Sequence, residues 1–311
     1  MGSGSWDSRS FASYTTSTKG VSLDSTGSVS YSYTTTDQDI FKVRHLDSAL
    51  DPKDVIRECR DSKEHPNTIP VIVGIDCTGS MGPAAVEVSK KLNVIMTDLY
   101  KDHKDIEFMV MGIGDLAYDS APIQVSQFES DIRIAEQLDK IYFEHGGGTN
   151  MYESYTAAWF IGTRQCKLDC WKRGKKGIII TMGDEQLNPY LPLRELKEVT
   201  GQDLQAQIET KDLYEEAKDK YDIYHIHVNH GASSRWREGE NLDSWGAVIG
   251  KDNVVASDVD GIAQQIVGFI DHSIQMNKTE ETPVVSWGST EAPTTEIPSP
   301  IEPLMSGNIT W

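Results

Sequence analysis

Short runs of apolar residues alternate along this chain with longer segments whose apolar residues recur every three or four positions. A run that is almost wholly apolar is typical of a strand covered on both faces, whereas the longer spacing indicates a helix with one buried side. Strands are predicted at residues 71–75, 106–115, 177–185, 222–230 and 253–257, and helices at 83–99, 132–143, 151–163, 202–220 and 261–274. This alternation predicts an α/β fold with a doubly wound, mainly parallel sheet and helices on both faces.

The two ends of the chain differ in composition from the part between them. Residues 1–38 are rich in Ser, Thr, Gly and Tyr and predict a flexible arm, although the alternating pattern at 28–33 leaves open pairing with a sheet edge or a second subunit. Residues 276–311 are rich in Pro, Thr, Ser and Glu and predict a disordered tail. Within that tail, Trp287 or Trp311 is expected to dock on a partner or back on the domain.

A single main domain is predicted at residues 69–275. It is preceded by a lead-in segment, residues 39–68, in which Asp51 as a cap and Pro52 in the first turn predict a short helix. A domain of this length is large enough to bury a full-sized core.

Acidic residues outnumber basic ones, with 48 Asp and Glu against 29 Lys and Arg and a formal net charge of −19. This charge argues against nucleic acid or an anionic membrane as the main partner, because both would be repelled. No apolar stretch reaches the roughly 20 residues that span a bilayer, so no membrane insertion is expected. The start of the chain lacks the pattern of a secretion signal, and the four cysteines form no disulfide framework, so a cytoplasmic location is predicted.

The first buried strand leads directly into a turn that carries Asp76, Thr78 and Ser80 on alternate residues, before a helix that begins near Pro83. Open α/β sheets place their ligand sites at the carboxyl ends of strands. One carboxylate and two hydroxyls supply only oxygen atoms, which hard divalent cations prefer, and they carry too little charge to neutralise such an ion. The sequence therefore predicts a divalent metal site that keeps affinity for an outside ligand.

This turn resembles the metal-ion-dependent adhesion motif (MIDAS) of the von Willebrand factor A (vWA) family, Asp-x-Ser/Thr-x-Ser. Two later segments resemble that family as well: the glycine-rich run 145–150, which contains Thr149, and the strand that ends at Asp184 and Glu185. The resemblance covers about residues 69–275. The family usually has Asp where this chain has Met182, so we prefer Asp184 as the last site residue, brought to the metal by a bulge at Gly183, with Glu185 as the alternative.

The resemblance implies a non-catalytic, metal-dependent protein-binding module or adaptor. Thr78, Ser80 and Thr149 would bind Mg²⁺ or Mn²⁺ directly or through water, and Asp76 and Asp184 would act largely through bound water. A protein partner would complete the metal site with a Glu or Asp. Intracellular members of the family suggest an AAA+ ATPase, or a stress-response or phage-associated assembly, as the partner class.

Other functions stay open at this point. A structural subunit of an assembly is one alternative, and a metal-dependent phosphoesterase with Asp76 as phosphoryl acceptor is another, although no activated nucleophile or general base is evident beside it. His225 and His227 alternate onto one face of a predicted strand, with His230 beyond them, and make a zinc site conceivable, but packing or hydrogen bonding at the strand end explains them more simply.

Overall fold

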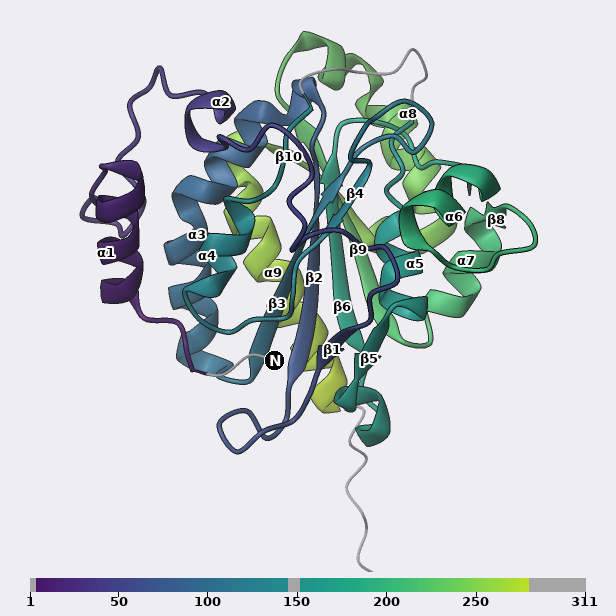
Figure 1. Ribbon diagram of the computed structural model, residues 1–311, viewed down its shortest axis with the longest axis horizontal. Helices are drawn as coiled ribbons and strands as arrows, with labels where there is room; N and C mark the ends of the chain where they lie inside the picture. Colours follow the sequence, from purple (N-terminus) through teal and green to yellow (C-terminus); the bar gives the residue numbers. More distant parts are fainter. Residues whose placement is uncertain (1–3, 145–151, 280–311) are drawn as a thin grey trace, which may run out of the picture.

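The computed structural model describes residues 4–144 and 152–279, and its centre is a six-stranded sheet in the order β10-β9-β6-β2-β3-β4 (Figure 1). Neighbouring strands are parallel except β4, which runs antiparallel to β3. The strands of this sheet are β2 (Ile69–Asp76), β3 (Ile106–Ile113), β4 (Ile123–Val125), β6 (Gly177–Gly183), β9 (Tyr221–Asn229) and β10 (Val254–Asp258). The predicted doubly wound, mainly parallel α/β architecture is confirmed.

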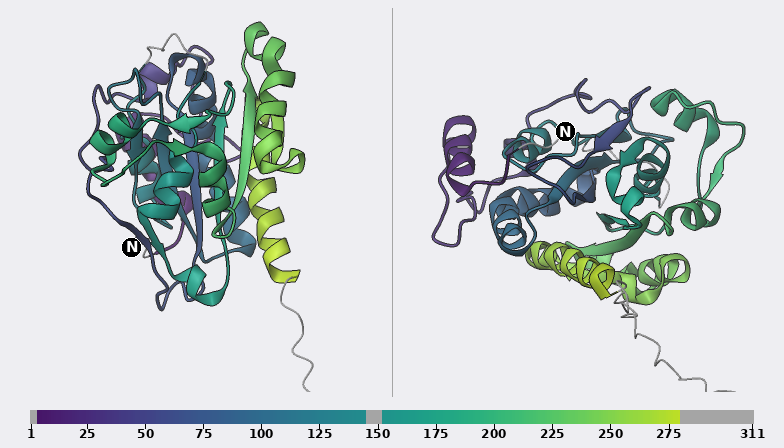
Figure 2. Two further views of the ribbon diagram at one scale, coloured as in Figure 1. Left: turned by 90° about the vertical axis from the view of Figure 1, so that its right-hand side faces the viewer. Right: turned by 90° about the horizontal axis from the view of Figure 1, so that it is seen from below.

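Helices cover both faces of the sheet, so that the molecule has three layers (Figures 1 and 2). The layer on one face contains α3 and α9 with α4 beside them, and the layer on the other face contains α5, α7 and α8. The helices are α1 (Ser8–Lys19), α2 (Asp37–Ile40), α3 (Gly82–Asp102), α4 (Arg133–Leu138), α5 (Ala157–Arg164), α6 (Leu193–Thr200), α7 (Thr210–Ala217), α8 (Ala232–Ile249) and α9 (Ile262–Thr279). Each helix layer packs on the sheet through its own apolar core.

Shorter elements join these layers. Two small sheets pair β1 (Arg57–Cys59) with β5 (Cys166–Leu168) and β7 (Tyr190–Leu191) with β8 (Ile208–Glu209). Short 3₁₀ helices lie at η1 (Gly79–Met81), η2 (Asp169–Arg173), η3 (Lys251–Asn253) and η4 (Val259–Gly261). Among the helices of the described residues, none has both the length and the apolar character required to cross a bilayer.

The order of the strands places a switch point between β2 and β6. From β2 the chain passes through α3 to β3 on one side, and β6 later pairs with β2 on its other side. The connections on either side of this point leave toward opposite faces, which opens a crevice at the carboxyl ends of the two strands. Any site built on the ends of β2 and β6 therefore lies where open α/β sheets bind their ligands.

The predicted flexible arm is wrong for the described part of residues 1–38. Helix α1 lies beside α3 (Figure 1), begins at the side-chain cap of Asp7 and ends at Gly20, which has a left-handed φ of 68°. Phe11 is buried in the core, and the Trp6 Nε1 donates to Asn93 Oδ1 at 3.0 Å. Hydroxyl groups such as that of Thr16 bond back to carbonyls within the helix, as Ser and Thr side chains often do in helices.

Several predicted boundaries also need correction. No helix forms at 51–57, because Asp51 Oδ1 accepts from the Lys53 backbone to make a turn, and Arg57 belongs to β1. The predicted helix at 202–220 is a loop, β8 and the shorter helix α7, while α4 and α5 cover only parts of 132–143 and 151–163. Residues 276–279 belong to α9 rather than to the tail, and the rest of the tail lies outside the described residues.

Candidate functional site

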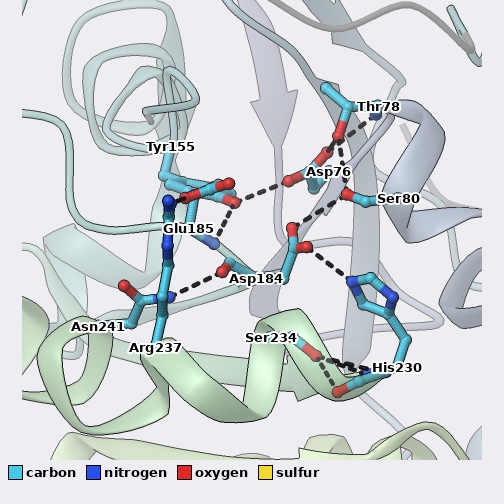
Figure 3. Close-up of polar contacts among 11 residues, drawn as sticks. Asp76, Thr78, Ser80, Tyr155, Asp184, Glu185, His230, Ser234, Arg237 and Asn241 are labelled. Atoms are coloured by element: carbon cyan, nitrogen blue, oxygen red, sulfur yellow. Dashed lines mark hydrogen bonds and ion pairs between the residues drawn. The ribbon is translucent and has the colours of Figure 1, made fainter. Parts of the chain in front are cut away.

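Asp76 is the last residue of β2 and is held at the carboxyl end of the sheet by the turn that follows it. The backbone N–H and the hydroxyl of Thr78 both donate to Asp76 Oδ1, at 2.9 and 2.6 Å. The chain then enters η1 and α3, which brings Ser80 back over the strand end (Figure 3). Asp76 and Thr78 are buried while Ser80 is exposed, so the cluster opens to solvent at Ser80.

The strand end of β6 meets this turn across the switch point. The Ser80 Oγ donates to Asp184 Oδ1 at 3.2 Å and lies 3.5 Å from the Thr78 Oγ1. The structure therefore brings together four of the five predicted site residues, from two segments about a hundred residues apart in sequence. The fifth, Thr149, lies outside the described residues.

Of the two acids that follow β6, Asp184 is the one that faces the turn. Glu185 instead meets Arg237, whose side chain extends from α8 and places its guanidinium 3.7 Å from Glu185 Oε2 (Figure 3). Two further α8 side chains hold the backbone of the same loop: the Asn241 amide donates to the Asp184 carbonyl at 2.8 Å, and the Trp245 Nε1 donates to the Glu185 carbonyl at 3.3 Å. Contacts from α8 thus place Asp184, and not Glu185, in the candidate site.

Tyr155 is a site residue that the sequence analysis did not find. Its hydroxyl donates to Asp76 Oδ2 at 2.7 Å, and its ring is fully buried. Gly183 permits this approach, because a Cβ at that position would lie 2.1 Å from the Tyr155 hydroxyl oxygen. Gly183, which ends β6, therefore also leaves the space that the Tyr155 side chain occupies.

His230 is a second residue that was missed in this role. Its Nε2 lies 2.6 Å from Asp184 Oδ2, on the side of the carboxylate opposite Ser80 (Figure 3). This contact with the carboxylate raises the pKa of His230. Asp184 is thus held between a hydroxyl and an imidazole, while Asp76 is held between a hydroxyl and a phenol.

The site concentrates negative charge in a buried place. Burial first, and then the negative charge of Asp184, raise the pKa of Asp76, against the hydrogen bonds from Thr78 and Tyr155. Burial and the charge of Asp76 likewise raise the pKa of Glu153, which is nearly buried beside the site and was not predicted as part of it. A positive charge placed among these groups would favour their ionised forms.

The donor atoms fit a hard divalent cation. Adjacent oxygens around an octahedral Mg²⁺ lie about 3 Å apart, close to the Ser80–Asp184 and Thr78–Ser80 separations of 3.2 and 3.5 Å. The hydroxyls of Thr78 and Ser80 give their protons to carboxylates, so their oxygen lone pairs stay available to a metal. Within the described ranges no group of three His, Cys, Asp or Glu is arranged to hold a metal, so such a site would depend on the hydroxyls.

The histidines of β9 are buried rather than gathered around a common point. The Nδ1 of His225 lies 2.9 Å from the Thr181 hydroxyl, and its ring stacks on Trp245 at 3.6 Å. Burial lowers the pKa of both His225 and His227. For His225, packing and hydrogen bonding are the simpler account, as expected from the sequence.

No protein-family model matches this sequence, and a search of curated proteins finds no match. Among solved structures, the chain is similar to the pilus adhesin SpaC of Lactobacillus rhamnosus GG in its open conformation, with a TM-score of 0.44 and 13% identity over 73% of this chain. It is also similar to the vWF domain of the type V pili tip protein Mfa5 of Porphyromonas gingivalis, with a TM-score of 0.43 and 12% identity over 70% of this chain and 98% of that domain. The match covers only 31% of SpaC. At this distance the likeness assigns no function.

Proposed function

We propose that this protein is a non-catalytic binding module that captures a carboxylate of a protein partner through a divalent cation, Mg²⁺ or Mn²⁺. The observation that carries the proposal is the contact between Ser80 and Asp184, which joins the turn after β2 to the end of β6. Thr78 and Ser80 would hold the ion through their oxygens, and Asp76 and Asp184 would orient these hydroxyls and act through bound water. The ion supplies Lewis acidity toward the partner's Glu or Asp.

The arrangement supports binding over catalysis. Asp76 is 0% exposed and accepts hydrogen bonds on both oxygens, so it is poorly placed to act as a phosphoryl acceptor. The exposed member of the cluster is Ser80, which is where an incoming carboxylate would arrive. We propose further that the partner belongs to an AAA+ ATPase or another large assembly in the cytoplasm. The alternative function is that of a structural subunit of an assembly.

Isothermal titration of the full chain with Mn²⁺ tests the metal site. We expect binding in the unmodified chain, strongly weakened binding in Ser80→Ala, and unchanged binding in Ser17→Ala, whose serine is exposed on α1 and serves as the matched control. Equal affinity in all three proteins would contradict the proposed site.

Affinity capture from a native lysate then tests the partner. We expect one set of proteins to be retained with Mg²⁺, lost with EDTA and lost with Ser80→Ala. Retention that ignores both EDTA and Ser80→Ala, combined with self-association of the pure chain, would favour the structural-subunit alternative.

A further inference from the structure

A pocket lies at the end of the sheet opposite the candidate metal site. It has a volume of about 470 Å³, and its lining residues lie where β2 and β6 begin and in the last turn of α9. Four of its lining residues are basic, namely Arg173, Lys175, Lys176 and Lys278, and none of the described residues that line it is acidic. In a chain with a net charge of −19, this is a local reversal of sign.

Two of the four basic side chains hold the walls of the pocket in place. Arg173 donates to the Thr68 carbonyl at 2.7 Å and pairs with Asp61, which fixes the segment at the end of η2 against the start of β2. Lys175 donates to the Asn277 carbonyl at 2.7 Å, which ties the same segment to the last turn of α9. The pocket is therefore bounded by two elements that are held together by hydrogen bonds.

The other two basic side chains are available to a ligand. Lys176 has only a long ion pair, with its Nζ 3.6 Å from Asp222 Oδ1, and its side chain is partly exposed. Lys278 is exposed and makes no ion pair with any described residue. A lysine ammonium is a compact point charge that suits a phosphate or carboxylate group.

Part of the pocket wall is apolar, beside the polar Asn67, Thr68 and Asn277. Ile69, Ile274 and Cys170 line the pocket together with the lysines, and the volume falls in the range of small-molecule sites. Such a surface suits a hydrocarbon group better than it suits a hydrated inorganic ion.

We propose that this pocket binds a small organic anion, a phosphate or carboxylate group carried on an apolar body. Lys176 and Lys278 contact the anionic group, and Ile69 and Ile274 contact the apolar part. This role is separate from the candidate metal site and does not depend on it.

The test is isothermal titration of the full chain with octyl phosphate, inorganic phosphate and the neutral octyl glucoside at low ionic strength. We expect octyl phosphate to bind at least about tenfold more tightly than either of the others, because only it satisfies both parts of the pocket. Lys278→Glu and Lys176→Glu should each weaken octyl phosphate binding by about tenfold or more. Lys211→Glu, which changes an exposed lysine of α7, is the matched control and should have no effect.

Circular dichroism of each variant establishes that it is folded. Absence of octyl phosphate binding, equal binding of inorganic phosphate, or equal losses in Lys278→Glu and Lys211→Glu would overturn the proposal. Residues 280–311 carry five Glu and no basic residue, so a chain that ends at residue 279 is titrated as well. If this truncation greatly increased the affinity for octyl phosphate, the pocket would be assigned to residues 280–311 as its occupant, and the proposed free ligand would be wrong.

Discussion

The two ends of the central sheet gather opposite charges. At the carboxyl end, Asp76 and Asp184 are linked through Thr78 and Ser80 across the switch point. At the amino end, Lys176 and Lys278 line a pocket that is partly apolar. The eight residues of β2 separate the two regions by about 25 Å, which exceeds the Debye length of roughly 8 Å at physiological ionic strength. The comparison teaches that a strongly acidic chain can keep two sites of opposite sign, because the sheet holds them too far apart to neutralise each other.

The largest expected effect is stabilisation by metal at the carboxyl end. At a Mn²⁺ concentration about a hundredfold above Kd, binding should add about 2.7 kcal/mol to the free energy of unfolding, and EDTA should remove the gain. Asp76→Asn should abolish this gain, yet leave the metal-free protein as stable as before or more so, because a buried charge repelled by Asp184 is gone. Thermal melting with and without metal measures both. An equal gain in Asp76→Asn would contradict the site.

A smaller effect is expected from Gly183→Ala at the same end. The new Cβ would displace the Tyr155 hydroxyl from Asp76, and overpacking of this kind costs about 2 kcal/mol of unfolding free energy. Gly268→Ala in α9 is the control, because nothing lies within 4 Å of the added Cβ, and it should stabilise the helix slightly. Chemical denaturation compares them. Equal stabilities would show that the Tyr155 contact is not constrained by Gly183.

At the amino end of the sheet, the buried carboxyl group of Glu107 in β3 should make the free energy of unfolding depend on pH. Burial raises its pKa to about 7, with Glu129 acting in the same direction and the Cys59 thiol and His65 opposing it. Because the folded state then binds a proton that the unfolded state has lost, stability should fall as the pH rises from about 4.5 through 7.

Glu107→Gln should reduce that slope and raise the stability at pH 8 by about 1 kcal/mol relative to the unmodified chain. Glu198→Gln, at an exposed position in α6, serves as the control and should leave the slope unchanged. Urea denaturation across this pH range gives the slopes, and identical slopes for all three proteins would show that Glu107 does not titrate as a buried group.

The smallest effect on stability is expected from Trp236→Ala. Trp236 is 83% exposed on α8, beside the residues that hold the Asp184 loop, and such exposed tryptophans often anchor protein partners. Stability should change by less than about 0.5 kcal/mol, while metal-dependent capture of the partner should weaken. Tyr33→Ala, at a fully exposed position near the amino terminus, should change neither.

The sequence was informative where a local pattern carries the structure. Buried parallel strands such as residues 177–183 are continuous apolar runs, and the end of such a strand marks a site, so Asp76 and Asp184 could be placed. Helix α8 was missed because its few apolar residues make a weak helical pattern: of its described side chains, Trp236 is exposed and only Trp245 and Ile249 are apolar and buried in the core.

Contacts between distant segments could not be read in this way. Tyr155 lies 79 positions from Asp76, and His230 lies 46 positions from Asp184, so neither pairing leaves a local signal. The ordered start of the chain was missed for a related reason: Phe11 and Trp6 are held by α3, and their environment appears only when the chain has folded.

The grip of α8 on the loop after β6 has a geometric consequence. Arg237, Asn241 and Trp245 recur every four residues, so one stripe of the helix holds the loop at three points. Each residue advances an α-helix by about 100°. A one-residue insertion between Asn241 and Trp245 would therefore rotate Trp245 away from the face that carries Arg237 and Asn241, and its contact with the loop would be lost. The spacing of these three residues along α8 therefore determines where the Asp184 side chain points. Insertions before or after this stripe should be tolerated far better than insertions within it.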